Sequence, residues 1–265
     1  MCSLYDGIRK IERIHILGIY RGNEIYLPFL FKRFIEWERY YSDISFQYYF
    51  LENDSMDKTR QLLQSFIKNR KNSKLILYKL KKDYSNIEDG RGFNRISTLA
   101  KLRNKLVDNI IPLPKNEWCL FIDSNIYFQD DILSQIFREC KPSDQNIGMI
   151  SVYAQQLMLP KIHTIKLDEP VLMSHFYDTY SIIDENGRSF FPQCPFEKCQ
   201  ICTNHQMKNE KIKHIPRIPK NKNVVEVSSC FGGFVLVSSD AFNNKNIRWS
   251  TIGFDMHNDL SLIHI

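Results

Sequence analysis

The chain has 265 residues, of which 43% are hydrophobic and 25% charged, a globular balance that excludes a disordered or fibrous protein. Its formal net charge is only +6, and the basic residues are spread along the chain instead of forming the basic stripe typical of nucleic-acid binders. No apolar run reaches 18 residues and no signal-peptide core is present, so we expect no transmembrane segment and a cytoplasmic location.

In the first half of the chain, short apolar runs alternate with segments of helical periodicity. Strands are predicted at residues 14–19, 44–51, 75–80 and 118–122, and helices at residues 27–41, 57–68 and 95–111. Ser55 or Asp57 is the expected N-cap of the second helix. Strands that alternate with helices in this way predict an α/β fold, with a mostly parallel central sheet covered by helices.

The second half is less regular. A further strand is predicted at residues 147–153, residues 190–223 are polar and rich in Lys, Pro and Cys, and residues 224–237 are again small and apolar. The basic run 208–222 has no interleaved aromatic residues, so we interpret it as a solvated loop and expect no nucleic-acid partner. No second hydrophobic core is evident, so we expect one domain over residues 1–265 with an irregular C-terminal elaboration.

Three polar clusters follow three of the predicted strands. Parallel strands joined by right-handed crossovers end at the same edge of a sheet, and open α/β sheets bind their ligands at that edge. We therefore expect the three clusters to lie close together. They are Tyr20-Arg21, Glu52-Asn53-Asp54 and Asp123-Ser124-Asn125.

The third cluster carries the strongest local signal. The buried strand 118–122 is followed directly by Asp123-Ser124-Asn125, which would place a carboxylate and an amide oxygen at the sheet edge. Such oxygen ligands suit Mg²⁺ or Mn²⁺, which keep open positions for phosphate oxygens and neutralise charge on a departing diphosphate. An ordinary Asx turn at a strand end is the alternative, and Asn125 is a weaker ligand than a second acid.

This turn after a buried strand resembles the Asp-x-Asp metal-binding motif of glycosyltransferases with the GT-A fold. Four further blocks resemble the fungal capsule-associated α-1,3-mannosyltransferase family in their order and spacing. They are Glu52-Asn-Asp-Ser-Met-Asp57-Lys-Thr59, Arg95-Ile-x-x-Leu-Ala100-x-Leu-Arg103-Asn104, Phe176-Tyr177-Asp178 with Asp184-x-x-Gly187, and Ser229-Cys230-Phe-Gly232-Gly233. The chain departs from the family pattern at Ile183, where an Arg is expected, and at Phe231-Gly232, where a Trp-Asn pair is expected.

The resemblance implies a GT-A-like, Rossmann-like mixed and mostly parallel sheet in a hexosyltransferase. It implies a nucleotide-binding half over residues 1–128 and an acceptor- and sugar-binding half over residues 129–265. The donor would be a GDP- or UDP-sugar, with GDP-mannose suggested by the family, and the acceptor would be a hydroxyl of a glycan. The alternative is a non-catalytic nucleotide- or glycan-binding protein on the same scaffold, which the imperfect Asp-x-Asn motif favours.

The expected donor and metal sites follow from these blocks. Residues expected to bind the nucleotide sugar are Tyr20, Arg21, Glu52, Asn53, Asp54, Arg103, Asp123, Ser124, Asn125, Tyr177, Gly232 and Gly233. Asp123, Asn125 and His257 are the expected ligands of Mn²⁺ or Mg²⁺. The alternative for Arg103 is a solvated helix face, and the alternative for the glycine pair is a plain bulge or tight turn.

Three acids are the candidates for catalysis. Asp178 is expected near the transferred sugar, beside the ring of Tyr177. Asp259, with Asp255 as the second choice, resembles the late acid that serves as general base in inverting GT-A enzymes. The alternatives are a surface turn for Asp178 and an ordinary helix start for the two C-terminal acids.

Seven cysteines, an odd number, favour buried thiols in a reducing compartment. Cys194, Cys199, Cys202 and His205 lie within twelve residues, and their spacing suits a structural Zn²⁺ site. Free thiols or a disulfide are the alternatives, because zinc sites usually separate two pairs of ligands by a longer loop.

Overall fold

The computed structural model describes residues 11–80, 93–140, 147–152, 155–158, 171–176, 183–184, 224, 227–229, 233–244, 248–250 and 262–264. None of the helices within these ranges is both long enough and apolar enough to span a bilayer.

The first half of the chain folds as its apolar pattern predicts, with element ends displaced by a few residues. Its elements are β1 (Arg13–Tyr20), α1 (Leu27–Tyr40), β2 (Ser45–Asn53), α2 (Thr59–Ile67), β3 (Lys74–Tyr78), α3 (Phe93–Asp108) and β4 (Trp118–Ile122). Each strand supplies apolar side chains to the core, and each helix turns one apolar stripe toward the sheet.

The second half contributes shorter elements. They are β5 (Ile126–Tyr127), α4 (Ile132–Cys140), β6 (Met149–Ser151), β7 (Gln155–Met158), β8 (Val171–Phe176), β9 (Ile183–Asp184), β10 (Val227–Ser229), β11 (Phe234–Ser238), α6 (Ser239–Asn243), β12 (Arg248–Ser250) and β13 (Leu262–His264). Helix α4 has no counterpart among the predicted elements, although Leu133, Ile136 and Phe137 lie buried on one of its faces.

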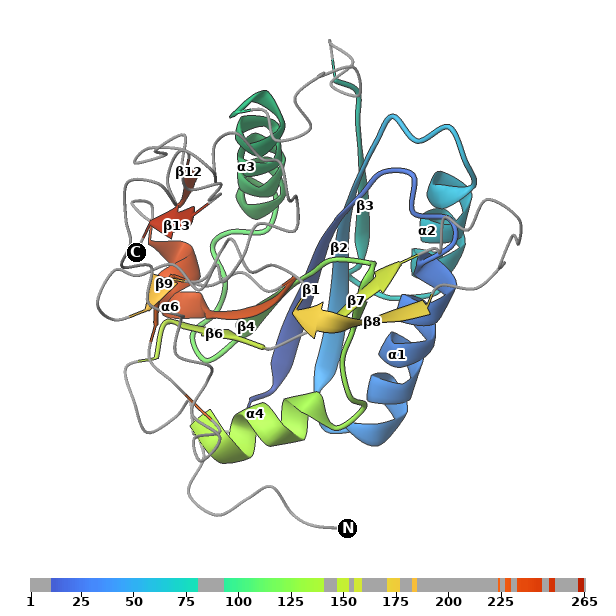
Figure 1. Ribbon diagram of the computed structural model, residues 1–265. Coiled ribbons are helices and arrows are strands. Elements are labelled where there is room, and N and C mark those ends of the chain that lie inside the picture. Colours follow the sequence, from blue (N-terminus) through green and yellow to red (C-terminus); the bar gives the residue numbers. More distant parts are fainter. Residues whose placement is uncertain are drawn as a thin grey trace.

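The central sheet has six strands in the order β3-β2-β1-β4-β11-β6 (Figure 1). Strand β1 pairs in parallel with both β2 and β4, and β2 pairs in parallel with β3. Strand β11 alone runs against its neighbours β4 and β6. The expected mixed, mostly parallel sheet flanked by helices is therefore confirmed.

The two faces of the sheet carry two hydrophobic clusters, because side chains alternate along each strand. In β1, Ile14 and Ile16 belong to the cluster under α1, α2 and α4, whereas Leu17 belongs to the cluster under α3 and α6. Figure 1 shows α1 and α2 on one side of the central strands and α3 on the other. The ring centroids of Phe31 and Phe66 lie 4.0 Å apart in the first cluster, and burying such a ring contributes about 1.5–3 kcal/mol.

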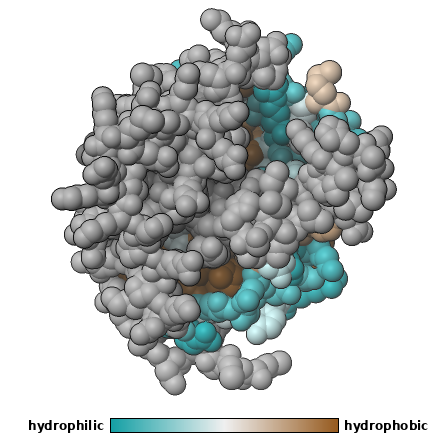
Figure 2. Space-filling model, viewed as in Figure 1, coloured by the Kyte–Doolittle hydropathy of each residue, from teal (hydrophilic) through white to brown (hydrophobic). Residues whose placement is uncertain are grey.

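Hydrophilic residues predominate on the described surface around α4 and the last turns of α1 (Figure 2). A cavity of about 490 Å³ opens in this region, at the end of α1 that is remote from β1's carboxyl end. Its lining residues are Glu36, Trp37, Arg39, Tyr40, Asp130 and Asp131. None of the residues expected to bind the nucleotide sugar or a metal lines this cavity.

Candidate active site

The three polar clusters that follow strands lie at one edge of the central sheet. Strands β2, β1 and β4 are adjacent and parallel, and Tyr20 at the end of β1 is paired with Glu52 of β2. The strand that follows β1 in the chain, β2, lies on one side of β1, whereas β4 lies on its other side. The strand order therefore reverses between β1 and β4, and open α/β sheets bind their ligands at such a switch point. The predicted convergence of Tyr20, Glu52 and Asp123 is therefore confirmed.

Tyr20 forms part of the floor beneath this edge. Its side chain is 0% exposed, and its hydroxyl donates a 3.3 Å hydrogen bond to the Ile122 carbonyl. The ring lies over Gly18, where an added Cβ would overlap the ring and its hydroxyl. Burial raises the pKa of Tyr20 well above its usual value, and the nearby Asp123 carboxylate raises it further. Tyr20 is therefore a neutral donor enclosed next to Asp123.

The turn after β4 is held on two sides by backbone hydrogen bonds. The Asp123 N–H donates to the Gly233 carbonyl at 2.9 Å, and the Asn125 carbonyl accepts from the Leu157 N–H at 2.8 Å. Gly233 has a φ of 73°, a conformation that favours glycine. Ser124 is buried, whereas Asp123 and Asn125 are half-buried at the sheet edge.

A carboxylate and an amide oxygen on one short turn are the donor types that Mg²⁺ and Mn²⁺ prefer, so Asp123 and Asn125 fit a divalent cation. Among the described residues, no group of three or more His, Cys, Asp or Glu side chains is placed to hold a metal. The third expected ligand, His257, lies outside these residues.

The cluster after β2 is largely engaged in shaping its own loop. The fully buried Glu52 carboxylate accepts hydrogen bonds from the Ser55 N–H and from Arg60 Nε, both at 2.8 Å. Asn53 is buried as well. Asp54 has a φ of 51°, and its carboxylate accepts from the Leu80 N–H at 2.9 Å. Contact of these residues with a nucleotide remains a prediction.

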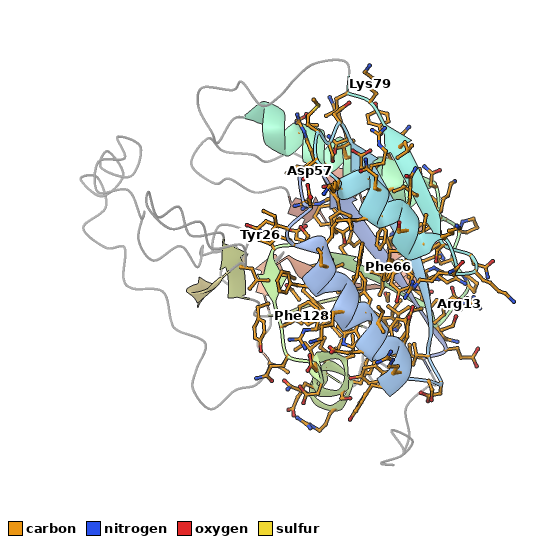
Figure 3. The ribbon with its side chains drawn as sticks, turned by 90° about the vertical axis from the view of Figure 1, so that its right-hand side faces the viewer. Arg13, Tyr26, Asp57, Phe66, Lys79 and Phe128 are labelled. Atoms are coloured by element: carbon orange, nitrogen blue, oxygen red, sulfur yellow. The ribbon has the colours of Figure 1, made fainter. Side chains whose placement is uncertain are left out.

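Lys58, and not Ser55 or Asp57, occupies the N-cap position of α2, and its side chain makes no capping bond. The Asp57 carboxylate nevertheless accepts a 3.0 Å hydrogen bond from the Thr59 N–H at the start of the helix, so the expectation for Asp57 is confirmed in part. The Ser55 hydroxyl instead accepts a hydrogen bond from the Gly22 N–H in the β1–α1 loop. Asp57 is also engaged by that loop, and Figure 3 shows it beside the turn that leads into α1.

Asp57 stays ionised in this position. Partial burial opposes the charge, but hydrogen bonds from the Thr59 side chain and from the Thr59 and Glu24 backbone N–H groups outweigh it and lower the pKa of Asp57.

Arg103 lies against the C-terminal part of the chain. It is only 7% exposed, and its guanidinium carbon lies 4.4 Å from the centre of the Trp249 ring. The next residue, Asn104, exchanges two hydrogen bonds with the Trp249 backbone, at 2.8 and 2.9 Å. The alternative of a solvated helix face is therefore wrong, and contact of Arg103 with a donor phosphate remains a prediction.

The remaining predicted site residues fall outside the described part of the chain. They are Tyr177, Asp178, Gly232, Asp255, His257 and Asp259, together with the cysteine-rich group Cys194, Cys199, Cys202 and His205.

Three solved structures are similar to the chain at low sequence identity. S. aureus TarS residues 1–349 are 13% identical, with 93% of this chain and 53% of that chain covered and a TM-score of 0.44. The mannosyltransferase PcManGT from Pyrobaculum calidifontis, solved with GDP-Man and Mn²⁺, is 11% identical, with 52% and 34% covered and a TM-score of 0.36. Core-mannan synthase A from Aspergillus fumigatus, in an Mn/GDP form, is 10% identical, with 95% and 64% covered and a TM-score of 0.31.

The chain thus spans about half the length of the TarS structure. No curated protein matches the chain in sequence. The family described as Cryptococcal mannosyltransferase 1 (CAP59_mtransfer) matches residues 19–261, which is nearly the whole chain. The chain therefore belongs to this mannosyltransferase family, as its motifs indicated.

Proposed function

We propose that this chain transfers a hexose, with mannose as the expected sugar, from a nucleoside diphosphate donor to a hydroxyl of a glycan acceptor. Family membership supports the reaction class, and GDP-mannose is the first donor to test, before UDP-sugars. The observation that carries the proposal is the position of Asp123, directly after β4 and next to the end of β1. This is the switch point of the sheet, where a nucleotide is expected to bind.

The β1–α1 loop supports a metal-dependent mode of donor binding. In dinucleotide-binding folds, backbone N–H groups at the corresponding loop hold the pyrophosphate. Here the N–H groups of Gly22, Asn23 and Glu24 already donate to side chains of the following loop. A divalent cation on Asp123 and Asn125 would instead neutralise the charge of the departing diphosphate.

In the proposed reaction, the acceptor oxygen attacks the anomeric carbon and the bond from that carbon to the diphosphate oxygen breaks. The acceptor proton passes to a general base, for which Asp259 and Asp255 are the candidates. Asp178 is the candidate for contact with the transferred sugar. These three roles are proposed from the family resemblance, because the residues lie outside the described part of the chain.

Donor hydrolysis and transfer, measured with GDP-mannose and Mn²⁺, test the proposal. We expect Asp123→Ala to lower turnover by roughly 100-fold or more, because the charge of the leaving diphosphate is then poorly stabilised. Chelation of divalent ions should abolish turnover in the wild type. Asp131→Ala is the matched control, since Asp131 is an exposed acid before α4 and should leave turnover unchanged.

The non-catalytic alternative makes the opposite prediction. A binding protein on this scaffold would be stabilised against heat by a nucleotide sugar but would not cleave it. Thermal shifts measured with GDP-, UDP- and CDP-sugars, each with and without Mn²⁺, identify the base. Stabilisation without any turnover would reject the enzymatic proposal.

A further inference from the structure

Two loops at the edge of the candidate site are joined in a regular pattern. Three consecutive backbone N–H groups of the β1–α1 loop, those of residues 22–24, each donate to one side chain of residues 55–59, which comprise the end of the β2–α2 loop and the first residue of α2. The Gly22 N–H donates to Ser55 Oγ at 3.2 Å, the Asn23 N–H to Thr59 Oγ1 at 2.7 Å and the Glu24 N–H to Asp57 Oδ2 at 3.1 Å. We call Ser55, Asp57 and Thr59 the loop clamp.

The clamp is reciprocal. The Glu24 carboxylate accepts a 3.0 Å hydrogen bond from the Lys58 N–H, and the Lys58 ammonium lies 3.8 Å from the same carboxylate. Each loop therefore donates backbone N–H groups to side chains of the other. Four hydrogen bonds thus join the two loops, and neither loop can move far without breaking several of them.

The clamp is also anchored to the sheet. Glu52 is the last residue but one of β2, and its buried carboxylate binds both the Ser55 N–H and Arg60 Nε. Thr59 is itself fully buried at the first turn of α2. Strand β2 thus fixes the position of the β2–α2 loop through Glu52, and the β2–α2 loop in turn fixes the position of the β1–α1 loop.

The pattern has a consequence for ligand binding. Backbone N–H groups that donate to the clamp are not available to a phosphate, so this loop does not form the anion cradle that a helix N-terminus often supplies. The exposed residue between β1 and the clamped N–H groups is Arg21, whose own N–H donates to Asn23 Oδ1. Arg21 is thus the exposed side chain that directly follows β1, at the sheet edge shared with Asp123.

We propose that Ser55, Asp57 and Thr59 are positioning residues, which hold the β1–α1 loop and Arg21 in a fixed geometry for the nucleotide of the donor. This inference rests on the proposed function, because it assumes that a nucleotide binds at the end of β1. It assigns a structural reason to the Ser-x-Asp-x-Thr pattern after β2, because each of the three side chains binds one of the N–H groups of residues 22–24.

Thr59→Val tests the clamp, because valine keeps the branched shape but cannot accept the Asn23 N–H. We expect hydrogen exchange of the peptide covering residues 20–27 to accelerate about tenfold or more, and the Kd for GDP with Mn²⁺ to rise about fivefold or more. Thr59→Ser restores the hydroxyl and should recover both values. Met56→Ala is the matched control, since Met56 lies in the same loop and is fully exposed.

Each result decides a different point. Unchanged exchange in Thr59→Val, with the variant folded as judged by circular dichroism, would overturn the clamp itself. Faster exchange with an unchanged Kd would overturn its role in positioning the nucleotide. If the wild type bound neither GDP nor UDP, the proposed function would fail and the positioning role with it, although the exchange measurement would still show whether the loops are joined.

Discussion

At the residue scale, the position of the Tyr20 ring depends on one neighbouring residue, Gly18. Tyr20 is among the residues expected from the sequence to bind the nucleotide sugar. The structure encloses its ring, because Gly18 two residues earlier on the same face leaves space for it. The hydroxyl then reaches the Ile122 carbonyl, next to Asp123. The sequence identified the position, but not that the ring folds back along its own strand.

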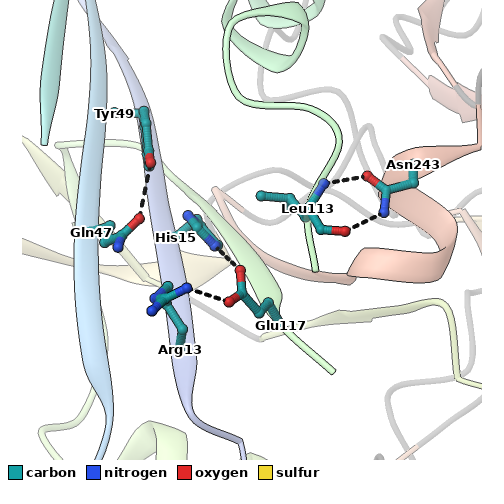
Figure 4. Close-up of polar contacts among 7 residues, drawn as sticks. All are labelled: Arg13, His15, Gln47, Tyr49, Leu113, Glu117 and Asn243. Carbon is teal, nitrogen blue, oxygen red and sulfur yellow. Dashed lines mark hydrogen bonds and ion pairs between the residues drawn. The ribbon is translucent and has the colours of Figure 1, made fainter. Parts of the chain in front are cut away.

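A second buried group concerns stability rather than the site. His15 is only 3% exposed, and its Nε2 lies 2.6 Å from the Glu117 carboxylate (Figure 4). Arg13 donates to the other oxygen of that carboxylate at 2.5 Å. Among the described residues, His15 Nδ1 has no hydrogen-bond partner. Burial lowers the pKa of His15, and Arg13 adds to this, against the opposing effect of Glu117.

The His15 pKa predicts the direction of a pH effect on stability. Because the folded-state pKa lies below the ordinary value of 6.5, the unfolded chain binds a proton more readily than the folded chain between these two values. The contribution of His15 is therefore fully present above pH 6.5 and is lost as the pH falls through this window. Urea denaturation of the wild type should show the free energy of unfolding decreasing from pH 7 to pH 5.

The matched variant is His15→Gln, whose amide can still donate to Glu117 but does not titrate. We expect it to unfold with a smaller pH dependence over the same range. An identical pH dependence in wild type and variant would show that other groups cause the effect.

At the scale of the elements, two asparagines connect the late part of the chain to the early part. Asn104 of α3 forms a pair of hydrogen bonds with the Trp249 backbone in β12. Asn243 of α6 forms a similar pair with the Leu113 backbone, at 2.8 and 2.7 Å (Figure 4). In each pair the side-chain amide bonds a backbone N–H and C=O as a neighbouring strand would.

Asn104→Ala tests the first of these connections. The change removes both part-buried hydrogen bonds to the Trp249 backbone, so we expect the free energy of unfolding to fall by about 1–3 kcal/mol. Exchange of the backbone amides in β12 should accelerate as well. Urea denaturation and hydrogen exchange measure the two effects. Lys101→Ala, an exposed position on the same helix, should change neither, and a result in which both variants behave alike would contradict the connection.

The elements of the first half could be predicted because each one carries its own local pattern. Strand β4 is a continuous apolar run and β1 is mostly apolar, and α1 and α3 show helical spacing between polar breaks. The loop clamp and the asparagine pairs could not be predicted in this way. They depend on residues 33 to 145 positions apart, and a local pattern contains no information about which distant loop will lie alongside.

At the scale of the whole molecule, the candidate site depends on strand order more than on any single motif. Alternation of strands and helices predicted that Arg21 and Asp123 would share one sheet edge, and the pairing of β1 with β4 confirms it. The insertion of β11 between β4 and β6 was not predictable, because its apolar residues at 234–238 indicate a buried strand without specifying its neighbours. That insertion supplies the Gly233 carbonyl that holds Asp123.

The same insertion predicts that the first half of the chain cannot fold alone. In a fragment of residues 1–128, β4 loses its antiparallel partner β11 along five paired positions. Phe128 loses the ring of Phe234, whose centroid lies 5.1 Å away, and Trp37 loses the same ring at 6.1 Å. We expect the full chain to show the near-ultraviolet circular dichroism of packed aromatic rings and a cooperative urea transition. The fragment should show neither. In the full chain, Phe234→Ala should lower the free energy of unfolding by about 3–5 kcal/mol, because a fully buried ring is removed from between these neighbours. A fragment that unfolded cooperatively would instead mean that β1 to β4 and their helices form an independent folding unit, to which β11 adds only an edge.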